Sequence, residues 1–301
     1  MITRFSTLVT GVSLFGCLSF LEPANAGRLA SEVGFNPPKM NALRLNIENQ
    51  NLASNRKMKG ENKGRMKKRS AGRPYSYYEA KGLFETGLEP VFPDGADCPS
   101  IASPFGAKTR YDGSFRKNPW FGYHNGMDIS LAAGTPLLAV ADAKVIHKGS
   151  AGRLVGNFIW LHLAPAATEL PIHIFARYQH LDEPSPLSIG DQVRAGEPIG
   201  QAGATGTTGG HFGTYGYSHL HLVLYTGPNS EVTPFRNKLK PHTLNFLDPM
   251  ALYLDKSIGA VTNQELRDLP SDKKKVPVSV QKIDGEKIPE DSKLVWPVSC
   301  E

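Results

Sequence analysis

Short apolar runs alternate with turn-forming residues through the middle of this chain. Between Pro90 and Leu254, runs rich in Val, Ile, Leu and aromatic residues are separated by Gly, Pro, Asn and Asp. This pattern is typical of short strands joined by tight turns, and no long amphipathic helix is evident. We therefore predict a mostly β fold built on an antiparallel sheet. The clearest expected strands are 136–141, 144–147, 157–163, 172–178 and 219–225.

The two ends of the chain differ from this central part. Residues 1–26 carry Arg4 near the start, then an apolar stretch, and end in a small-x-small motif at Ala26, which is the pattern of a cleavable export signal. A membrane anchor is the alternative, but the apolar stretch is short for a full span, so we expect no stable membrane span after cleavage. Residues 27–75 are polar and basic, which predicts a disordered linker or pro-segment. A folded domain is expected over 76–254, followed by an extended polar tail over 255–301.

The basic surplus of the chain lies in one segment. Residues 27–75 hold 12 Lys and Arg against 3 Asp and Glu, whereas residues 76–301 hold a small excess of acidic residues. The densest part is 56–69. Nucleic acid is a common partner of such a run, but an exported protein meets anionic envelope polymers and lipid head groups first. We expect a solvated linker with some attraction to anionic envelope polymers, and no nucleic-acid partner.

Export also changes the meaning of the three cysteines. Cys17 lies in the signal and leaves with it, unless it is a lipid-modified residue. The mature chain then keeps Cys98 and Cys300, an even pair in an oxidising compartment. We expect a disulfide between them that fastens the C-terminal end to the domain; two free thiols are the alternative.

Histidines in the expected strand 219–225 carry the strongest chemical signal. His219 and His221 are two residues apart, so their side chains project from one face of a strand. Upstream, His124 and Asp128 add an imidazole and a carboxylate in a loop that enters a strand. Zinc takes nitrogen and oxygen ligands, and a catalytic site with three protein ligands keeps one position for water. We interpret the chain as a zinc hydrolase, with both His219 and His221 open as ligands at this point.

The remaining histidines of the nine differ in their settings. His180 ends the strand that contains Tyr178, and it is a further candidate for chemistry. His211 lies in a Gly- and Tyr-rich loop, where surface is the simplest interpretation. The others lack a partner motif and are expected to be structural or surface residues: His147, His162, His173 and His242.

An ordered set of motifs resembles one known family, the lysostaphin-type (LytM-like) zinc metalloendopeptidases. The resemblance covers roughly residues 100–252, and the ordered set is more specific than any single motif. The motifs are Ser103-Pro-Phe-Gly106, His124-Asn-Gly-Met-Asp128, Gly134 to Asp142, Tyr178-Gln-His-Leu181, Gly190 to Gly200, Gly203-Ala-Thr-Gly206 and His219-Leu-His221.

This resemblance implies a fold, a cofactor, a substrate and a role for each residue. The fold would be the family's antiparallel, sandwich-like sheet with a groove, and the substrate would be cross-linking or stem peptides of bacterial peptidoglycan. His124, Asp128 and His221 would hold Zn²⁺. His180 and His219 would be catalytic, one as the base and the other as the group that stabilises the oxyanion, in an order the sequence leaves open.

Departures from the family pattern leave alternatives open. Residues 211–218 separate the Gly-rich turn from His219, and 163–172 resembles an insertion, so the groove or substrate choice could differ. The alternative function is a non-catalytic envelope factor that binds the wall or activates another hydrolase. Another alternative is a latent enzyme in which residues 27–75 cover the groove.

Overall fold

A computed structural model describes residues 74–116, 122–207, 212–240 and 244–301. The expected signal 1–26 and nearly all of the basic segment 27–75 lie outside the described residues, as do His211 and His242. Predictions on those parts therefore stay predictions. Residues 70–301 group into one compact unit. None of the helices in the described ranges is long and apolar enough to cross a membrane.

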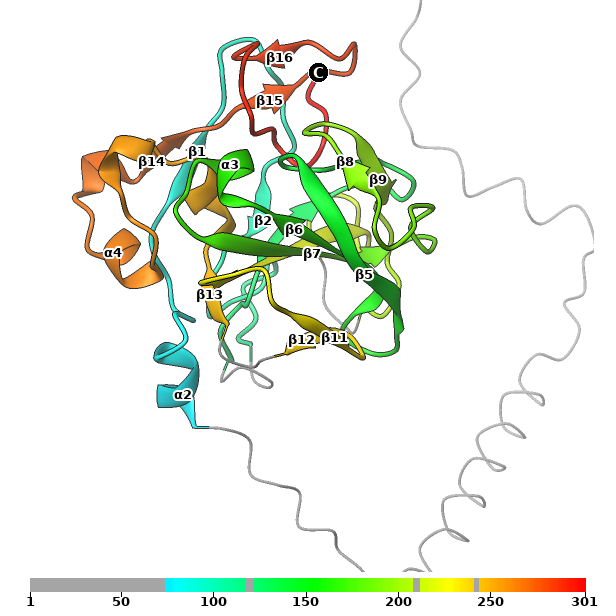
Figure 1. The fold of residues 1–301 in the computed structure, drawn as a ribbon, viewed down its shortest axis with the longest axis horizontal. Helices are drawn as coiled ribbons and strands as arrows, with labels where there is room; N and C mark the ends of the chain where they lie inside the picture. The colour runs from blue at the N-terminus through cyan, green and yellow to red at the C-terminus, as the bar shows by residue number, and fades with distance from the viewer. Residues whose placement is uncertain (1–73, 117–121, 208–211, 241–243) are drawn as a thin grey trace, which may run out of the picture. The chain divides into compact units, whose positions relative to one another are not determined.

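An antiparallel sheet of eight strands forms the centre of the fold (Figure 1). Its neighbours follow the order β2-β3-β10-β7-β6-β5-β8, and β13 pairs with β10 beyond the end of β3. The mostly β prediction is confirmed. The strands are β2 (Ile101–Ser103), β3 (Met127–Ser130), β5 (Ala143–Ala151), β6 (Gly156–Leu163), β7 (His173–Leu181), β8 (Gln192–Val193), β10 (His219–Gly227) and β13 (Asn245–Leu247).

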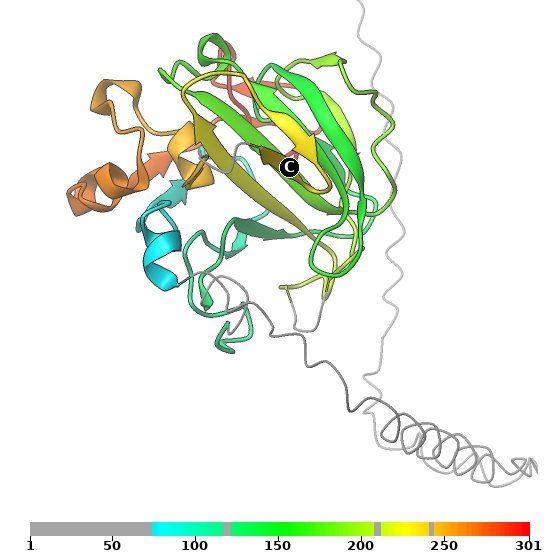
Figure 2. The ribbon, with the colours of Figure 1, turned by 60° about the horizontal axis from the view of Figure 1, so that its bottom comes forward.

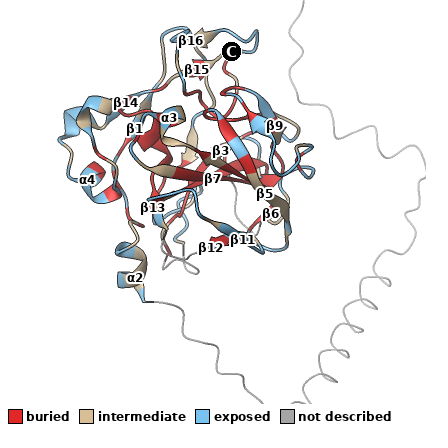
Figure 3. Cartoon of the chain, viewed as in Figure 1, coloured by how far each residue is buried: buried red, intermediate tan, exposed pale blue. Residues whose placement is uncertain are grey.

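Alternation along β10 gives its two faces different partners. Leu220, Leu222 and Leu224 point into the main hydrophobic core, together with Leu161 of β6. Successive strand residues point to opposite faces, so His219 and His221 project from the other side. The burial view shows the middle strands of the sheet as the most buried part of the molecule (Figure 3).

Smaller elements surround this sheet. The pair β4 (Pro136–Leu138) and β9 (Pro198–Gln201) contributes Leu137 and Ile199 to the main core, so it covers the apolar face in a sandwich-like arrangement. The other strands are β1 (Glu89–Val91), β11 (Thr233–Phe235), β12 (Lys238–Lys240), β14 (Lys275–Pro277), β15 (Val280–Gln281) and β16 (Lys287–Ile288). The helical turns are short: α2 (Tyr75–Glu79), α3 (Pro165–Thr168), α4 (Asn263–Arg267), η2 (Pro249–Leu252), η3 (Lys256–Ile258) and η4 (Ser271–Lys273).

The residues that follow α2 pack against α4 on one side of the domain (Figure 2). Asn263 Nδ2 donates a hydrogen bond to the carbonyl of Gly82 at 2.7 Å. The guanidinium of Arg267 lies 4.2 Å from the centre of the Phe84 ring. The N-terminal side of the domain is therefore fastened to a segment almost two hundred residues later in the chain.

The C-terminal segment corrects one expectation. Residues 255–301 are not an extended tail, because Val276, Val278, Val280 and Trp296 are buried in the same core cluster as the main sheet. Their spacing of two residues in 276–280 is a strand signal that the many surrounding lysines and prolines hide. The parallel pairing of β14 with β1 joins this segment to the start of the domain.

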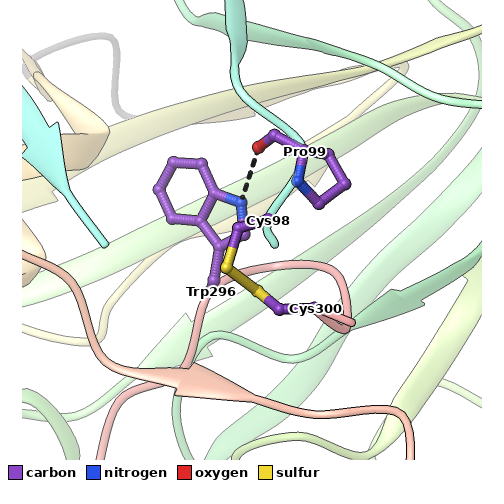
Figure 4. Close-up of a disulfide and its surroundings, with 4 residues drawn as sticks. All are labelled: Cys98, Pro99, Trp296 and Cys300. Atoms are coloured by element: carbon purple, nitrogen blue, oxygen red, sulfur yellow. Dashed lines mark hydrogen bonds between the residues drawn. A yellow bond between two sulfur atoms is a disulfide. The ribbon is translucent and has the colours of Figure 1, made fainter. Parts of the chain in front are cut away.

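The expected disulfide is present between Cys98 and Cys300, which closes 202 residues of chain (Figure 4). Beside it, Trp296 Nε1 donates a hydrogen bond to the carbonyl of Pro99 at 3.2 Å. The bridge thus holds the last strand-like segment against the residues that lead into β2.

Candidate metal centre

Two motifs far apart in the sequence meet because β3 and β10 are antiparallel neighbours. In their register His221 lies opposite Asp128, and His219 lies opposite Ser130. His124 precedes β3 in the loop that leads into it. The pairing of two strands therefore brings an imidazole next to a carboxylate, and the loop brings in the third group.

The three side chains point their donor atoms at one another. Asp128 Oδ1 lies 2.7 Å from His221 Nδ1 and 3.1 Å from His124 Nε2, and the two nitrogens are 3.1 Å apart. All three residues are buried. Within the described ranges they form a group that could hold a metal ion. Two ring nitrogens and a carboxylate oxygen at these separations fit the ligand set and the size of a zinc site with three protein ligands.

Backbone and side-chain contacts fix the orientation of the first imidazole. His124 Nδ1 lies 2.9 Å from the carbonyl oxygen of Pro104 and 3.4 Å from Ser103 Oγ. Because Nδ1–H donates to a carbonyl, the Nε2 lone pair is left for the metal. The Ser103-Pro-Phe-Gly106 motif therefore has a physical role: its carbonyl sets the tautomer of His124.

Sequence reasoning missed Arg116 at this site. Arg116 Nη2 lies 3.4 Å from Asp128 Oδ2 and donates to Ser103 Oγ at 2.8 Å. It thereby holds the carboxylate oxygen that the two histidines do not contact. No motif marks Arg116 in the sequence, and only the fold places it beside Asp128.

Gly126, in the middle of the upstream motif, allows β3 and β10 to approach. A Cβ added at this position would lie 2.5 Å from the carbonyl oxygen of Leu222 and 2.8 Å from His221 Cε1. Both separations are too short for real atoms, so the histidine ring packs directly on the glycine backbone. A larger residue would displace His221 from the metal centre.

Burial and charge set the ionisation of Asp128 and His221. Burial alone raises the pKa of Asp128. The charge interactions and hydrogen bonds that this carboxylate makes with His124 and His221 outweigh burial and hold the pKa well below its ordinary value. Burial lowers the pKa of His221 to about 4, against the opposing effect of Asp128. A carboxylate and neutral imidazoles are the forms that bind a metal.

A β-bulge brings His180 to the same side of the sheet. Across β6 and β7, Phe158 pairs with Gln179 and Asn157 pairs with Leu181, so His180 is the extra residue. Its φ of 63° lies in the left-handed region, which is uncommon for a residue with a side chain. Strict alternation would place His180 on the core face with Tyr178, and the bulge re-aims it instead.

His180 and His219 form a second pair of rings beside the metal ligands. Their ring centres are 4.6 Å apart, and His219 Nε2 lies 3.8 Å from Asp128 Oδ1. His180 Nδ1 lies 2.7 Å from the carbonyl oxygen of Thr205, and His219 Nδ1 lies 2.9 Å from that of Tyr217. Since Nδ1–H donates to a carbonyl in each ring, Nε2 is the acceptor. Burial lowers the pKa of His180 to about 3 and lowers that of His219 as well, so both rings are neutral.

Comparison with known proteins agrees with this geometry. Residues 122–234 match the model of peptidase family M23. This range contains the metal ligands His124, Asp128 and His221. Residues 122–234 form an M23 peptidase domain. The resemblance found in the motifs is confirmed, and zinc is the metal that this M23 site takes.

Curated relatives are similar to part of this chain. The glycyl-glycine endopeptidase ALE-1 of Staphylococcus capitis is 34% identical over 115 residues, which are 37% of this chain and 27% of that protein. The DD-carboxypeptidase/endopeptidase Mpg of Neisseria meningitidis is 27% identical over 187 residues, which are 61% of this chain and 36% of that protein. The chain thus spans about a quarter to a third of the length of these relatives.

Solved structures that match part of this chain include those of two peptidases. The catalytic domain of lysostaphin from Staphylococcus simulans is 27% identical with a TM-score of 0.31, covering 43% of this chain and 78% of that chain. A zinc-containing peptidase from Vibrio cholerae is 26% identical with a TM-score of 0.32, covering 48% of this chain and 37% of that chain.

A groove opens on the M23 domain beside His221. Its volume is about 520 Å³, and its floor is the face of β6, β7 and β10 that carries Trp160, Gln179 and Tyr225. Tyr77 and Tyr78 of α2 line one wall. The five residues expected from the sequence lie together. Of these five, His221 also lines the groove, which is large enough for a peptide segment.

Proposed function

We propose that this protein is an exported zinc endopeptidase that hydrolyses peptide bonds in the cross-links or stem peptides of bacterial peptidoglycan. The observation that carries the proposal is the convergence of three buried ligands and two further buried histidines, beside a groove that His221 lines. The printed names of the relatives add support, since both are endopeptidases.

The chemistry divides between the metal and the protein. His124, Asp128 and His221 would hold Zn²⁺, which would supply Lewis-acid chemistry for a peptide carbonyl and for water. The residues of the chain supply the proton transfers and hydrogen bonds. His180 and His219 each hold Nδ1–H on a backbone carbonyl, which leaves Nε2 as the acceptor on each ring.

A neutral imidazole can accept a proton from the attacking water, and a protonated one can stabilise the oxyanion. We propose that His180 and His219 share these two roles. The lowered pKa values keep both rings unprotonated before the reaction, so either can serve as the base. Substrate is oriented by the groove on β6, β7 and β10.

Export is part of the proposal because the folded domain contains a disulfide. Disulfides form and persist in oxidising compartments outside the cytoplasm. Together with the signal pattern expected in residues 1–26, this favours the periplasm or the cell wall as the place of action. Peptidoglycan is the polymer present there, and the basic segment 56–69 would add attraction to anionic envelope polymers.

The test is digestion of purified sacculi by the mature full-length chain, with and without a chelator, beside the His221→Ala variant. Release of muropeptides by the wild type that stops with the chelator and with His221→Ala supports the proposal. Stoichiometric zinc binding without release of any fragment would favour a non-catalytic envelope factor instead.

A further inference from the structure

The groove runs from the metal ligand His221 to a buried arginine. Gln179 pairs with His221 across β7 and β10, and Arg177 pairs with Val223 two residues further along β7. Two residues of strand span about 7 Å. Both Gln179 and Arg177 line the groove. The distance from the ligand His221 to Arg177 therefore corresponds to about two residues of an extended peptide.

Arg177 is only 5% exposed and has no carboxylate partner among the described residues. Its guanidinium lies 5.0 Å from the centre of the Trp160 ring, and Nη1 donates to the carbonyl of Asn237 at 2.9 Å. A buried charge is costly unless it is paired with an opposite charge. An arginine held in this way on the floor of a groove therefore favours an anion that arrives with the substrate.

Unpaired polar atoms gather around the same place. Within the described ranges, four buried side-chain atoms lack a hydrogen-bond partner, and three of them belong to groove residues: Trp160 Nε1, Arg177 Nε and Gln179 Oε1. Buried polar groups are nearly always satisfied, so a cluster of three in one cavity indicates a missing polar ligand. The two N–H groups can donate to an anion, and the amide oxygen can accept from a peptide N–H.

The charge of the groove wall agrees with an anionic ligand. Besides Arg177, its lining holds the cations Lys81, Arg153 and Lys238, and no Asp or Glu lines it among the described residues. The guanidinium is the side chain whose geometry best matches a carboxylate, because its N–H groups can contact both oxygens.

We propose that Arg177, with Trp160, forms a carboxylate-binding subsite that selects peptides bearing a free carboxylate about two residues from the scissile bond. This inference rests on the proposed peptidase function and narrows its substrate class. Arg177 is then a specificity residue, outside the chemistry at the metal. The carboxylate can be a C-terminal or a side-chain group, since both offer the same two oxygens.

The experiment compares soluble cross-linked muropeptides with the same muropeptides after their carboxyl groups are converted to carboxamides. The full-length chain and Arg177→Gln are assayed for kcat/KM on each, and Lys238→Gln is the matched control. Glutamine can still donate to the carbonyl of Asn237, whereas Lys238 is an exposed cation of the same groove. Thus the two variants remove the same charge from a buried and an exposed position.

We expect wild type and Lys238→Gln to prefer the carboxylate form by about 10-fold to 100-fold, the range of a charged hydrogen bond. Arg177→Gln should lose that preference while keeping its rate on the carboxamide form. Synthetic stem peptides amidated at only the C-terminal or only the side-chain carboxyl identify which group is bound. Equal rates of the wild type on both forms overturn the subsite, even if Arg177→Gln fails to fold.

A binding measurement tests the carboxylate subsite independently of peptide hydrolysis. Quenching of tryptophan fluorescence is titrated with both muropeptide forms, using zinc-loaded wild type and Arg177→Gln. Tighter binding of the carboxylate form that depends on Arg177 supports the subsite even if no bond is cleaved, in which case the peptidase proposal fails alone. Cleavage with equal affinity for both forms overturns the subsite and leaves the peptidase.

Discussion

The two faces of β10 carry opposite chemistry on consecutive residues. Leu220 and Leu222 are buried in the main core, whereas His219 and His221 lie at the metal centre. One strand therefore supports the fold and the chemistry at the same time, and strand alternation separates the two tasks. This comparison predicts that damage to one face leaves the other task largely intact.

The largest expected difference is between His221→Ala, which should lose zinc and activity, and Leu222→Ala, which should lose stability. His221→Ala removes a ligand, so bound zinc and sacculus hydrolysis should be lost. The loss of metal affinity should exceed about 10- to 100-fold, which is the usual cost of removing a group that only hydrogen-bonds to a ligand. Leu222→Ala should lower the unfolding free energy by about 2–5 kcal/mol and keep zinc where the protein is folded. Metal analysis and denaturant unfolding measure these outcomes. A folded Leu222→Ala protein without zinc would contradict the separation of faces.

Within the histidine face, His219→Ala tests the difference between ligand and proton-transfer group. The variant should bind zinc as the wild type does, because His124, Asp128 and His221 remain. Its kcat should fall by about 10²- to 10⁴-fold, the usual contribution of a general acid or base. Zinc content and sacculus turnover are compared directly. Loss of zinc in His219→Ala would make it a ligand instead.

On the apolar side of the sheet, removing the disulfide should have a smaller effect, and only on the free energy of unfolding. Replacing both cysteines, Cys98→Ser with Cys300→Ser, should cost about 2–5 kcal/mol of unfolding free energy, because the bridge closes a long segment of chain. Zinc affinity and kcat at 25 °C should stay within about twofold, since the bridge lies behind the core face. Thermal unfolding and activity assays check this, and a protein that loses zinc would show that the faces are coupled.

The last effect is confined to a limited pH range. Burial raises the pKa of Asp248 to about 6 against the lowering effect of a hydrogen bond from Thr86. The folded state then holds a proton between about pH 4 and 6 that the unfolded state releases. Stability from this group is present at the acidic end and is lost as pH rises through 6, on the order of 3 kcal/mol in all. Asp248→Asn should flatten this slope in unfolding measured from pH 4 to 7, and an unchanged slope would exclude Asp248 as its cause.

Several features could be predicted because they depend on local spacing. The positions of His219 and His221 on one strand face follow from alternation, and the strands 157–163 and 219–225 agree closely with β6 and β10. The motif containing His124 and Asp128 enters a strand as expected. Such patterns are visible because alternate residues of β10 meet different surroundings, the main core on one face and the metal centre on the other.

Other features depended on contacts between distant segments. The β-bulge that turns His180 toward His219 breaks the alternation on which sequence reasoning relies. Arg116 reaches Asp128 through a loop that carries no motif. Residues 255–301 pack into the core through valines spaced among lysines and prolines, so their polar composition gave the wrong expectation.

The sequence by itself determined the ligand types, their places on strand faces and the mostly β class, since these follow from side-chain chemistry and a period of two residues. Only the tertiary structure decided which atoms converge. Strand pairing set Asp128 opposite His221, a bulge redirected His180, and the pairing of β6 with β7 set Arg177 beside Trp160. Distances across a sheet depend on the pairing of segments about a hundred residues apart. The alternation in each strand fixes the face that a residue occupies, but not which residue of the other strand lies opposite it.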